Sequence, residues 1–532
     1  MVGGAWRAWR GRAWLAAAMR GLVSSSSGLL RRRPSVGAGV LARSKGAVAQ
    51  LDLSHVPSLR LDNMNERLKE MQYAVRGEVP IRAMAIDREL SAGSSKYPFR
   101  KILYCNIGNP QSMGQPPLSF YRNVLSLVDN PAVMSRGSSE ELERLFGREE
   151  VARAKEILGY VKNTGAYSES QGVEGIRQNV ARFIAERDGY PSEPGNIFLS
   201  NGASSSIQWL LTAIISGPQD AVLIPIPQYP IYTALIALLG GKCAGYFLSE
   251  RTKWSLRESE LERALAGAVA QGQRPRAFVL INPGNPTGNT LAYEDVATVI
   301  KFCHRHQLVL LADEVYQENT YNKEQAFVSA KKVAMDLDLP VELASFHSTS
   351  KGFIGECGRR GGYMEMVNFD PDVQAQIVKL ASSALCSGLD GQVMTDLMVR
   401  GPPKGSKAHE QFERERDQVL ANLHYKSAML HERLNAIEGV SCQPLEGAMY
   451  AFPKLELPDA FVRHANKLGK KPDALYALRL LEETGICTVP GSGFEQEPGT
   501  YHIRMTFLPP QDELEKAMDR FADFHAKIMA TK

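Results

Sequence analysis

The most regular part of the chain begins near Asn196, where short apolar runs alternate with stretches of helical periodicity. The apolar runs are residues 197–199, 221–224, 277–281, 308–311 and 343–346. The helical stretches between them include residues 204–215, 232–239, 259–270 and 294–306. Apolar strands separated by amphipathic helices are typical of a parallel sheet covered on both faces. The pattern therefore predicts an α/β fold with a mostly parallel sheet sandwiched by helices.

Each apolar run leads into a polar or glycine-rich loop. These loops are residues 200–204, 225–229, 282–288, 312–316 and 347–351. In an open α/β sheet, ligands bind beyond the carboxyl ends of the parallel strands. We therefore expect the five loops to meet at one pocket.

The pattern changes after Gly401. A break rich in proline and glycine, residues 401–405, precedes a long charged helical stretch at 408–435 and strand-like runs at 447–452 and 502–507. Near the other end, residues 63–76 read as a helix. A chain of 532 residues is long enough for two or three domains. The predicted division is a leader (1–50), an N-terminal arm with part of a small domain (51–115), a large domain (116–400) and a small C-terminal α+β domain (401–532).

The leader changes the meaning of the net charge of +4. Residues 1–51 hold eight arginines and one lysine but no acidic residue, and they include the serine run 24–27. Such a composition is typical of an organelle transit peptide that is removed after import, with a disordered basic tail as the alternative. Mitochondrion is preferred over plastid. The rest of the chain is mildly acidic and offers no basic field to nucleic acid.

Other compositional features narrow the class of protein. No run reaches the roughly 18 apolar residues that a membrane span needs. The seven cysteines are scattered and form no Cys-x-x-Cys pair, which favours free thiols over a disulfide framework or zinc site. The cluster at 303–306 lies within a helical pattern, so we interpret it as helix surface and predict no metal site.

The strongest candidate for chemistry is Lys351. It follows an apolar run, is flanked by hydroxyls, and precedes a series of glycines that leads to Arg360. A lysine placed there can approach a ligand and act as a Schiff-base nucleophile, and the fork of Arg360 suits a phosphate. Asp313, directly after another apolar run, could pair with a protonated ring nitrogen, or could cap a helix. Asn285 could donate to a ligand oxygen, or could belong to a plain turn.

Small residues at the start of a predicted helix suggest where an anion binds. Gly202, Ala203 and Ser204 stand between a strand and a helix, so backbone N–H groups and the helix dipole face any bound anion. The segment lacks the Gly-Lys-Ser/Thr ending of a Walker loop. Tyr229, at the end of the next strand, could stack on an aromatic ligand or pack in the core.

Together these residues resemble the fold-type I aminotransferases that depend on pyridoxal 5'-phosphate, and within them the alanine aminotransferase branch. The resemblance covers nearly all of residues 60–528. Its most telling segments are residues 73–77, 106–111, 113–115, 165–172, 224–230, 281–288, 311–317, 447–450, 489–494 and 504–510.

The resemblance implies a role for each matched residue. Lys351 is expected to form the Schiff base and to act as the base for the 1,3-proton shift, and Asp313 to pair with the pyridinium nitrogen. The remaining cofactor contacts are Asn285 and Tyr316 at the phenolate oxygen, Tyr229 as the stacking ring, and Ala203, Ser204, Ser348 and Arg360 at the phosphate. Arg360 is preferred over Arg359 because two glycines follow it. Arg504 and Gly108 are expected to hold the substrate α-carboxylate. Tyr167 is expected to reach the phosphate of a neighbouring subunit, which implies a homodimer with shared sites.

The implied activity is transfer of an amino group between L-alanine and 2-oxoglutarate by ping-pong chemistry through pyridoxamine phosphate, in the mitochondrial matrix. Glutamate:glyoxylate transfer or a broader specificity is the first alternative, because a few pocket side chains decide the substrate. A lyase or synthase of the same fold is a second. A non-catalytic regulator is disfavoured because Lys351 is intact and no DNA-binding module is recognisable.

Overall fold

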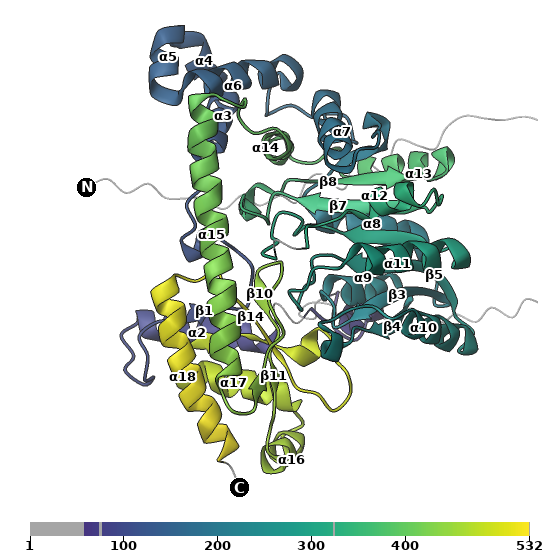
Figure 1. Ribbon diagram of the computed structural model, residues 1–532, viewed down its shortest axis with the longest axis vertical. Helices are drawn as coiled ribbons and strands as arrows, with labels where there is room; N and C mark the ends of the chain where they lie inside the picture. Colours follow the sequence, from purple (N-terminus) through teal and green to yellow (C-terminus); the bar gives the residue numbers. More distant parts are fainter. Residues whose placement is uncertain (1–57, 74–76, 323–324, 531–532) are drawn as a thin grey trace, which may run out of the picture. The chain divides into compact units, whose positions relative to one another are not determined.

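The computed structural model describes residues 58–73, 77–322 and 325–530, and residues 63–532 form one compact unit. Its centre is a sheet of seven strands. In spatial order these are β2 (Ile197–Leu199), β8 (Gly362–Val367), β7 (Leu343–Ser348), β6 (Val309–Asp313), β5 (Arg274–Ile281), β3 (Asp220–Ile226) and β4 (Lys242–Phe247). All neighbours are parallel except β8, which runs antiparallel to both β2 and β7. The predicted mostly parallel sheet is confirmed (Figure 1).

The five apolar runs identified in the sequence all lie in strands, whereas β4 and β8 were not expected. Strand β4 begins with exposed residues at the edge of the sheet, so its sequence lacks an apolar run. Strand β8 contains Glu365, which is buried because Lys331 donates a hydrogen bond of 2.6 Å to it. A buried ion pair of this kind interrupts the apolar pattern without interrupting the strand.

Side chains that alternate along the strands enter two different cores. In β5, Ala277 and Val279 belong to one core, whereas Phe278 and Leu280 belong to the other. The first core includes residues of α8 (Ala203–Ile214) and α9 (Ile231–Leu239). The second includes residues of α10 (Glu258–Ala270), α11 (Tyr293–His306) and α12 (Ala330–Asp336). The sheet is therefore covered on both faces, as its apolar strands require.

A helical region precedes and flanks the sheet. It comprises α3 (Ser119–Asp129), α4 (Pro131–Arg136), α5 (Ser139–Phe146), α6 (Arg148–Val161), α7 (Glu174–Asp188), α13 (Pro371–Ser382) and α14 (Leu389–Val399). Local sequence explains where α5 begins. Ser138 and Glu141 exchange side-chain and backbone hydrogen bonds in a capping box.

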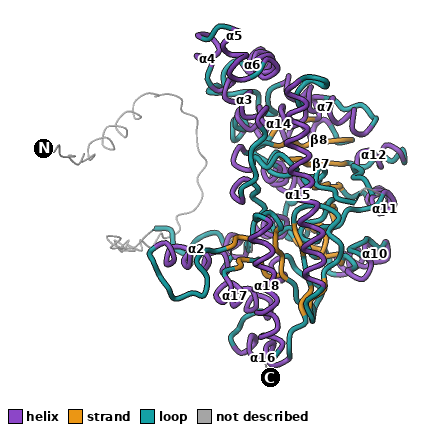
Figure 2. Tube along the Cα trace, turned by 60° about the vertical axis from the view of Figure 1, so that its left-hand side comes forward, coloured by secondary structure: helices purple, strands orange, loops and turns teal. Residues whose placement is uncertain are grey.

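The C-terminal part contains the long helix α15 (Lys407–Asn435), predicted almost to the residue, and then short strands and helices (Figure 2). These are β9 (Val440–Ser441), β10 (Tyr450–Ala451), β11 (Lys454–Leu455), α16 (Asp459–Lys467), α17 (Pro472–Thr484), β12 (Ile486–Cys487), β13 (Val489–Pro490), β14 (Ile503–Thr506) and α18 (Gln511–Met529). The N-terminal strand β1 (Leu103–Tyr104) pairs with β12. The domain boundaries proposed from the sequence stay a prediction.

The helix expected over residues 63–76 is wrong in extent. Among the described residues of this range, the structure has α1 (Glu66–Glu70), which Asn65 caps at its start, and Met71 leaves it in an extended conformation. Leu68, one of the apolar residues of the expected helix, is exposed. A second helix, α2 (Glu78–Ser91), went unpredicted and is linked to α17 by the ion pair Arg82–Glu482. The proposed leader, residues 1–50, lies outside the described residues. Within the described part of the chain, no helix is both long and apolar enough to cross a membrane.

Candidate active site

A pocket of about 630 Å³ lies at the carboxyl edge of the parallel strands. All five loops supply residues that line the pocket, and the first of them supplies Gly202, Ala203 and Ser204, at the start of α8. The loops contribute Tyr229, Asn285, Asp313, Tyr316, Ser348 and Lys351. Segments remote in sequence add Tyr73, Gly108, Arg360, Tyr450 and Arg504. The expected convergence of the loops is confirmed, and eleven of the twelve predicted site residues line this pocket.

Lys351 lies directly after the loop that follows β7, with its ammonium inside the pocket. Its Nζ donates a hydrogen bond of 2.9 Å to the Gly108 carbonyl and lies 5.8 Å from the centre of the Tyr316 ring. The next residue, Gly352, has a φ of +69° and is held by the Asn319 side chain at 2.8 Å. Only glycine adopts that conformation without strain, so the glycines after Lys351 shape the loop that presents it.

Asp313 ends β6 and is buried at the bottom of the pocket. Its Oδ2 accepts a hydrogen bond of 2.9 Å from the Tyr232 hydroxyl, whereas its Oδ1 has no partner in the described part of the chain. Burial raises the pKa of this carboxyl to about 6, against the opposing effects of Tyr232 and Lys351. A buried acceptor without a donor is costly. The site thus fits a ligand that brings an N–H group to Asp313.

One end of the pocket is built for an anion. Gly202 precedes α8 with a φ of +74°, and Ala203 and Ser204 begin the helix, whose first N–H groups point outward. The Arg360 guanidinium lies against Gly202, where a Cβ would meet its Nη2 at 2.7 Å. Arg360 Nη2 also donates to the Asn201 carbonyl at 3.0 Å. A phosphate-sized anion would meet both the helix dipole and this guanidinium.

Two other residues considered for this end differ in their surroundings. The hydroxyl of Ser348 lines the pocket and donates to the Gly361 carbonyl at 3.2 Å. Arg359 instead forms an ion pair of 3.2 Å with Asp390 and does not line the pocket. The geometry therefore favours Arg360 over Arg359 for contact with a ligand.

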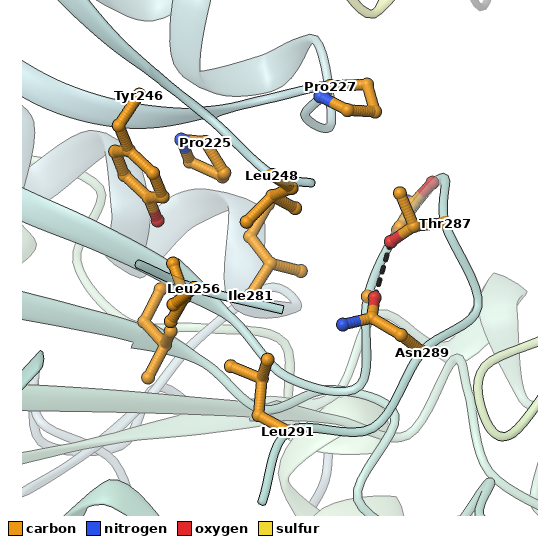
Figure 3. Close-up of a pocket in the computed structure, with 12 residues that line it drawn as sticks. Pro225, Pro227, Tyr246, Leu248, Leu256, Ile281, Thr287, Asn289 and Leu291 are labelled. Carbon is orange, nitrogen blue, oxygen red and sulfur yellow. Dashed lines mark hydrogen bonds between the residues drawn. The ribbon is translucent and has the colours of Figure 1, made fainter. Parts of the chain in front are cut away.

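Asn285 is held by a loop that is braced from behind. Thr287 Oγ1 donates to Asn289 Oδ1 at 2.6 Å, a bond visible in Figure 3, and Asn282 Oδ1 accepts from the Leu291 N–H at 2.9 Å. Behind the loop lies a small cavity lined largely by apolar side chains, among them Tyr246 and Leu256 (Figure 3). These bonds fix the backbone, so the Asn285 amide is presented in one orientation.

The tyrosines form the walls of the pocket. The Tyr229 and Tyr73 hydroxyls lie 2.6 Å apart, which joins the N-terminal segment to the sheet edge. The Tyr316 hydroxyl donates to the Tyr450 hydroxyl at 3.4 Å. Sequence reasoning quoted the segments that contain Tyr73 and Tyr450 but assigned these two residues no role. No local signal distinguishes them from core tyrosines.

Arg504 lies at the other end of the pocket and is only 1% exposed. Its Nη1 and Nη2 donate to Asn285 Oδ1 at 3.0 Å and to the Asn106 carbonyl at 2.6 Å, and its Nε has no partner among the described residues. The guanidinium lies over the Tyr450 ring at 4.1 Å and the Phe494 ring at 4.6 Å. No carboxylate of the described residues lies within ion-pair distance of it. Buried charges are normally paired, so this cation suits an anion from outside the chain.

Gly108 and Tyr167 occupy contrasting positions. A Cβ on Gly108 would collide with the Tyr450 hydroxyl and, at 2.9 Å, with Met449 Sδ. Only glycine therefore allows this backbone to lie beside Arg504 and Lys351. Tyr167, in contrast, is 79% exposed and does not line the pocket.

Taken together, the pocket has a cation at each end and a lysine between them. Arg360 and Arg504 face one cavity with Lys351, and Asp313 is the only carboxylate among the described residues that line it. Such a surplus of positive charge favours ligands with several negative charges, for example a phosphate monoester together with a carboxylate.

Comparisons with known proteins agree with this chemistry. The family model "Aminotransferase class I and II" matches residues 145–521. The chain is 48% identical over 486 residues to a probable mitochondrial alanine aminotransferase of Dictyostelium discoideum, covering 90% of each chain. It is 46% identical over 480 residues to alanine aminotransferase 1 of Homo sapiens, covering 88% of this chain and 95% of that one. It is also 44% identical over 477 residues to glutamate–glyoxylate aminotransferase 1 of Arabidopsis thaliana, covering 89% and 97%.

The fold is shared with solved structures as well. An alanine aminotransferase from Pyrococcus furiosus superposes with a TM-score of 0.69 over 87% of this chain and 100% of that one, at 24% identity. At that identity the likeness establishes the fold alone. The family match extends over more than half of the chain and includes the lysine, aspartate and arginine of the pocket. This protein belongs to the class I and II aminotransferases.

Proposed function

We propose that the protein transfers an amino group from L-alanine to 2-oxoglutarate, giving pyruvate and L-glutamate, and catalyses the reverse reaction, with pyridoxal 5'-phosphate as cofactor. The relatives named alanine aminotransferase support this pair of substrates. One pocket would serve the two substrates in turn, which is ping-pong kinetics. Both substrates carry an α-carboxylate, so one arginine serves both half-reactions.

The residues of the pocket fit this cofactor. Arg360 and the start of α8 would hold the phosphate, Asp313 Oδ1 would accept from the ring N–H, and Asn285 and Tyr316 would donate to the ring oxygen. Tyr229 would lie against the ring. When bound, pyridoxal phosphate supplies an aldehyde that takes up the amino group and a protonated ring that withdraws electrons from the reacting carbon. Asp313 would keep that ring protonated, because its buried Oδ1 lacks a donor among the described residues and the ring N–H would supply one.

Arg504 and Lys351 then divide the work on the substrate. Two of the five N–H groups of Arg504 are bonded to Asn285 and Asn106, which leaves three for a carboxylate. A two-point grip fixes the orientation of the substrate as well as binding it. Lys351 Nζ, hydrogen-bonded to Gly108 beside that grip, would take the proton from the substrate α-carbon. The aromatic rings around Arg504 exclude water and strengthen the pairing.

A single observation carries this proposal. Arg504 is a fully buried cation, and its partners among the described residues are an amide oxygen, a carbonyl and two aromatic faces. A guanidinium in that situation needs an anion, and the nearest free space is the pocket that also contains Lys351 and Asp313. This combination matches transfer chemistry on substrates with an α-carboxylate.

Glutamate:glyoxylate transfer is the second candidate. It is favoured by the similarity to glutamate–glyoxylate aminotransferase 1 of Arabidopsis thaliana, which is close to that found for the alanine enzymes. Both reactions use the same lysine, aspartate and arginine. Only the side chains around the substrate's variable group would distinguish them.

Assembly and location extend the proposal. The exposed Tyr167 would reach the phosphate of a second copy of the chain, which makes the active unit a homodimer. The acid-free, arginine-rich residues 1–50 would direct the protein to the mitochondrial matrix and be removed there, in line with relatives named mitochondrial. Plastid import remains the alternative because the two kinds of leader share this composition.

A substrate panel on the purified protein tests the proposal. We expect a yellow protein that bleaches with L-alanine and recovers its colour with 2-oxoglutarate. Faster turnover with glutamate and glyoxylate than with alanine and 2-oxoglutarate would favour the second candidate. Repeated turnover of an amino acid without any oxo-acid acceptor, beyond one product per active site, would overturn both in favour of a lyase.

A further inference from the structure

A second cavity of about 480 Å³ lies away from the catalytic pocket and shares none of its functional side chains. It is bounded by the segment that leads into α3, by one face of α15 and by the chain between β14 and α18. Helix α15 contacts both α3 and α18 (Figure 1). The volume falls in the range of about 300–1,000 Å³ that is typical of small-molecule sites.

The lining of this cavity is amphipathic. Its apolar wall comes from Met113, Leu118, Val419, Leu423, Leu508 and several prolines. Amide side chains, among them Gln418 and Asn422, are exposed and also line it. Such a lining suits a molecule with an aliphatic body and one polar end.

Lys426 supplies a cation to this lining. The residue is only 5% exposed, and its Nζ donates a single hydrogen bond of 3.1 Å to the Leu508 carbonyl, which belongs to the cavity wall. No acidic residue of the described chain forms an ion pair with it. Burial lowers the pKa of Lys426 to about 8. A lysine is almost never this buried without a charged partner, so an anion is the missing element.

The one carboxylate in the lining is already engaged. Glu415 Oε2 accepts from the Ser119 N–H at 2.8 Å, and its Oε1 accepts from the Ser119 hydroxyl at 2.6 Å and from Gln411 at 2.9 Å. It holds the start of α3 against α15 and leaves Lys426 without a counter-ion. Lys426 can therefore pair with one negative charge of an occupant.

The cavity also touches the catalytic loop. Its lining residues Pro110 and 113–119 follow closely after Gly108, whose carbonyl accepts from Lys351. Gln115 donates a hydrogen bond of 2.8 Å to the Phe353 carbonyl, two residues after Lys351. Space is tight there, because a Cβ on Gly355 would meet Gln115 Nε2 at 2.9 Å. An occupant of the cavity would thus press on the segment that holds Lys351.

We propose that this cavity binds an aliphatic monocarboxylate, with its carboxylate on Lys426, and that binding alters turnover through residues 108–115. Binding itself is independent of the proposed function, whereas the effect on turnover rests on it. Absence of octanoate binding would therefore contradict this inference, whereas absence of alanine turnover would contradict the proposed function.

Isothermal titration of the holoenzyme with octanoate tests the binding. Octanoate could also reach Arg504, so the titration is repeated in the Arg504→Met background. We expect octanoate to bind there still, and Lys426→Met to lower its affinity at least tenfold. Octanol, which has the same chain without the charge, should bind at least tenfold more weakly than octanoate.

Two further variants keep the test decisive. Asn422→Trp changes an exposed residue and should block the cavity even if Lys426→Met folds poorly. Lys516→Met changes an exposed residue of α18 outside the cavity and should leave the affinity for octanoate unchanged. In steady-state assays octanoate should change kcat at saturating alanine in the wild type, and this effect should be lost in Asn422→Trp. Unchanged octanoate affinity in both cavity variants, or binding lost in Arg504→Met alone, would overturn the proposal.

Discussion

Two arginines of this protein use the same planar fork in opposite ways. Arg187, at the end of α7, donates two hydrogen bonds of 2.7 Å to the Asp188 carboxylate and a third of 2.8 Å to Gln317. Asp188 also accepts from Ser329 at 2.8 Å. Arg504 is more deeply buried, yet the described residues offer it no carboxylate. The chain thus supplies a carboxylate to the Arg187 guanidinium, whereas the described residues supply none to the Arg504 guanidinium.

The difference separates structural charges from functional ones. A buried ion pair that is complete within the chain can only hold the fold together, because nothing more can bind to it. A buried charge that lacks its counter-ion costs free energy, and selection retains it where a ligand supplies the counter-ion. Within the part of the chain that the structure describes, Asp313 has one oxygen without a partner and Lys351 is hydrogen-bonded only to a carbonyl, so both follow the same logic as Arg504.

The largest effect is expected from Lys351→Ala. Removing the amine should lower kcat by about 10³-fold or more, since it removes both the nucleophile and the proton carrier. The melting temperature should change little because Lys351 has no ion pair in the described chain. Steady-state kinetics and thermal unfolding measure the two outcomes. Lys379→Ala, on the surface of α13, is the control, and near-normal kcat in Lys351→Ala would contradict the assignment.

Arg187→Met should act on stability instead of catalysis. Asp188 would stay buried without its cation, which costs about 3–5 kcal/mol of unfolding free energy. Denaturant unfolding measures this loss, while KM for alanine should stay unchanged. Arg305→Met breaks exposed pairs with Glu258 and Glu262 and should cost much less stability, because solvent screens these charges. Equal losses in the two variants would remove the distinction drawn above.

Asp313→Asn should stabilise the cofactor-free protein while abolishing activity. Burial raises the pKa of Asp313 from 3.8 to about 6, so the folded state binds a proton more tightly than the unfolded state. Stability from this group is complete below pH 3.8 and is lost as the pH rises through about 6. At pH 8 the variant should gain up to about 3 kcal/mol over wild type.

The control for Asp313→Asn is a comparison of the same two proteins at low pH. Near pH 4 the carboxyl of the wild type is largely protonated, so the gain of the variant should shrink towards zero. Unfolding of both proteins, stripped of cofactor, is compared at pH 4 and pH 8. A variant less stable than wild type at pH 8 would show that burying the ionised Asp313 carboxylate does not destabilise the cofactor-free protein.

Arg504→Lys is expected to give the smallest of these effects. A lysine keeps the charge but cannot reproduce the fork, so KM for both the amino acid and the oxo acid should rise about tenfold. The rise should be similar for both partners because each carries the same α-carboxylate. Unchanged KM for either partner would remove Arg504 from the carboxylate site.

Much of the sheet and site could be predicted because their signals are local. Strands β5, β6 and β7 are apolar runs, and the residues that follow them, such as Asn285 and Asp313, fall at one sheet edge by topology alone. Strand β8 could not be predicted because Glu365 looks exposed until Lys331 is placed beside it. The extent of α1 was missed because its apolar positions are solvent-facing in the folded chain.

Other site residues depend on contacts between distant segments. Tyr73 and Tyr229 are 156 positions apart, and Arg504 lies 219 positions from the Asn285 it touches. The choice between Arg359 and Arg360 follows from which one lies against Gly202. No periodicity encodes such neighbours.

By itself the sequence determined the α/β class, the loops that carry chemistry and the family resemblance, because these follow from local apolar periodicity and short motifs. Only the tertiary structure decided which charges remain without a partner in the described chain. Pairing of a buried group depends on what the fold brings within hydrogen-bond distance. That is why the unpaired Arg504, the free oxygen of Asp313 and the isolated Lys426 could be recognised only in three dimensions.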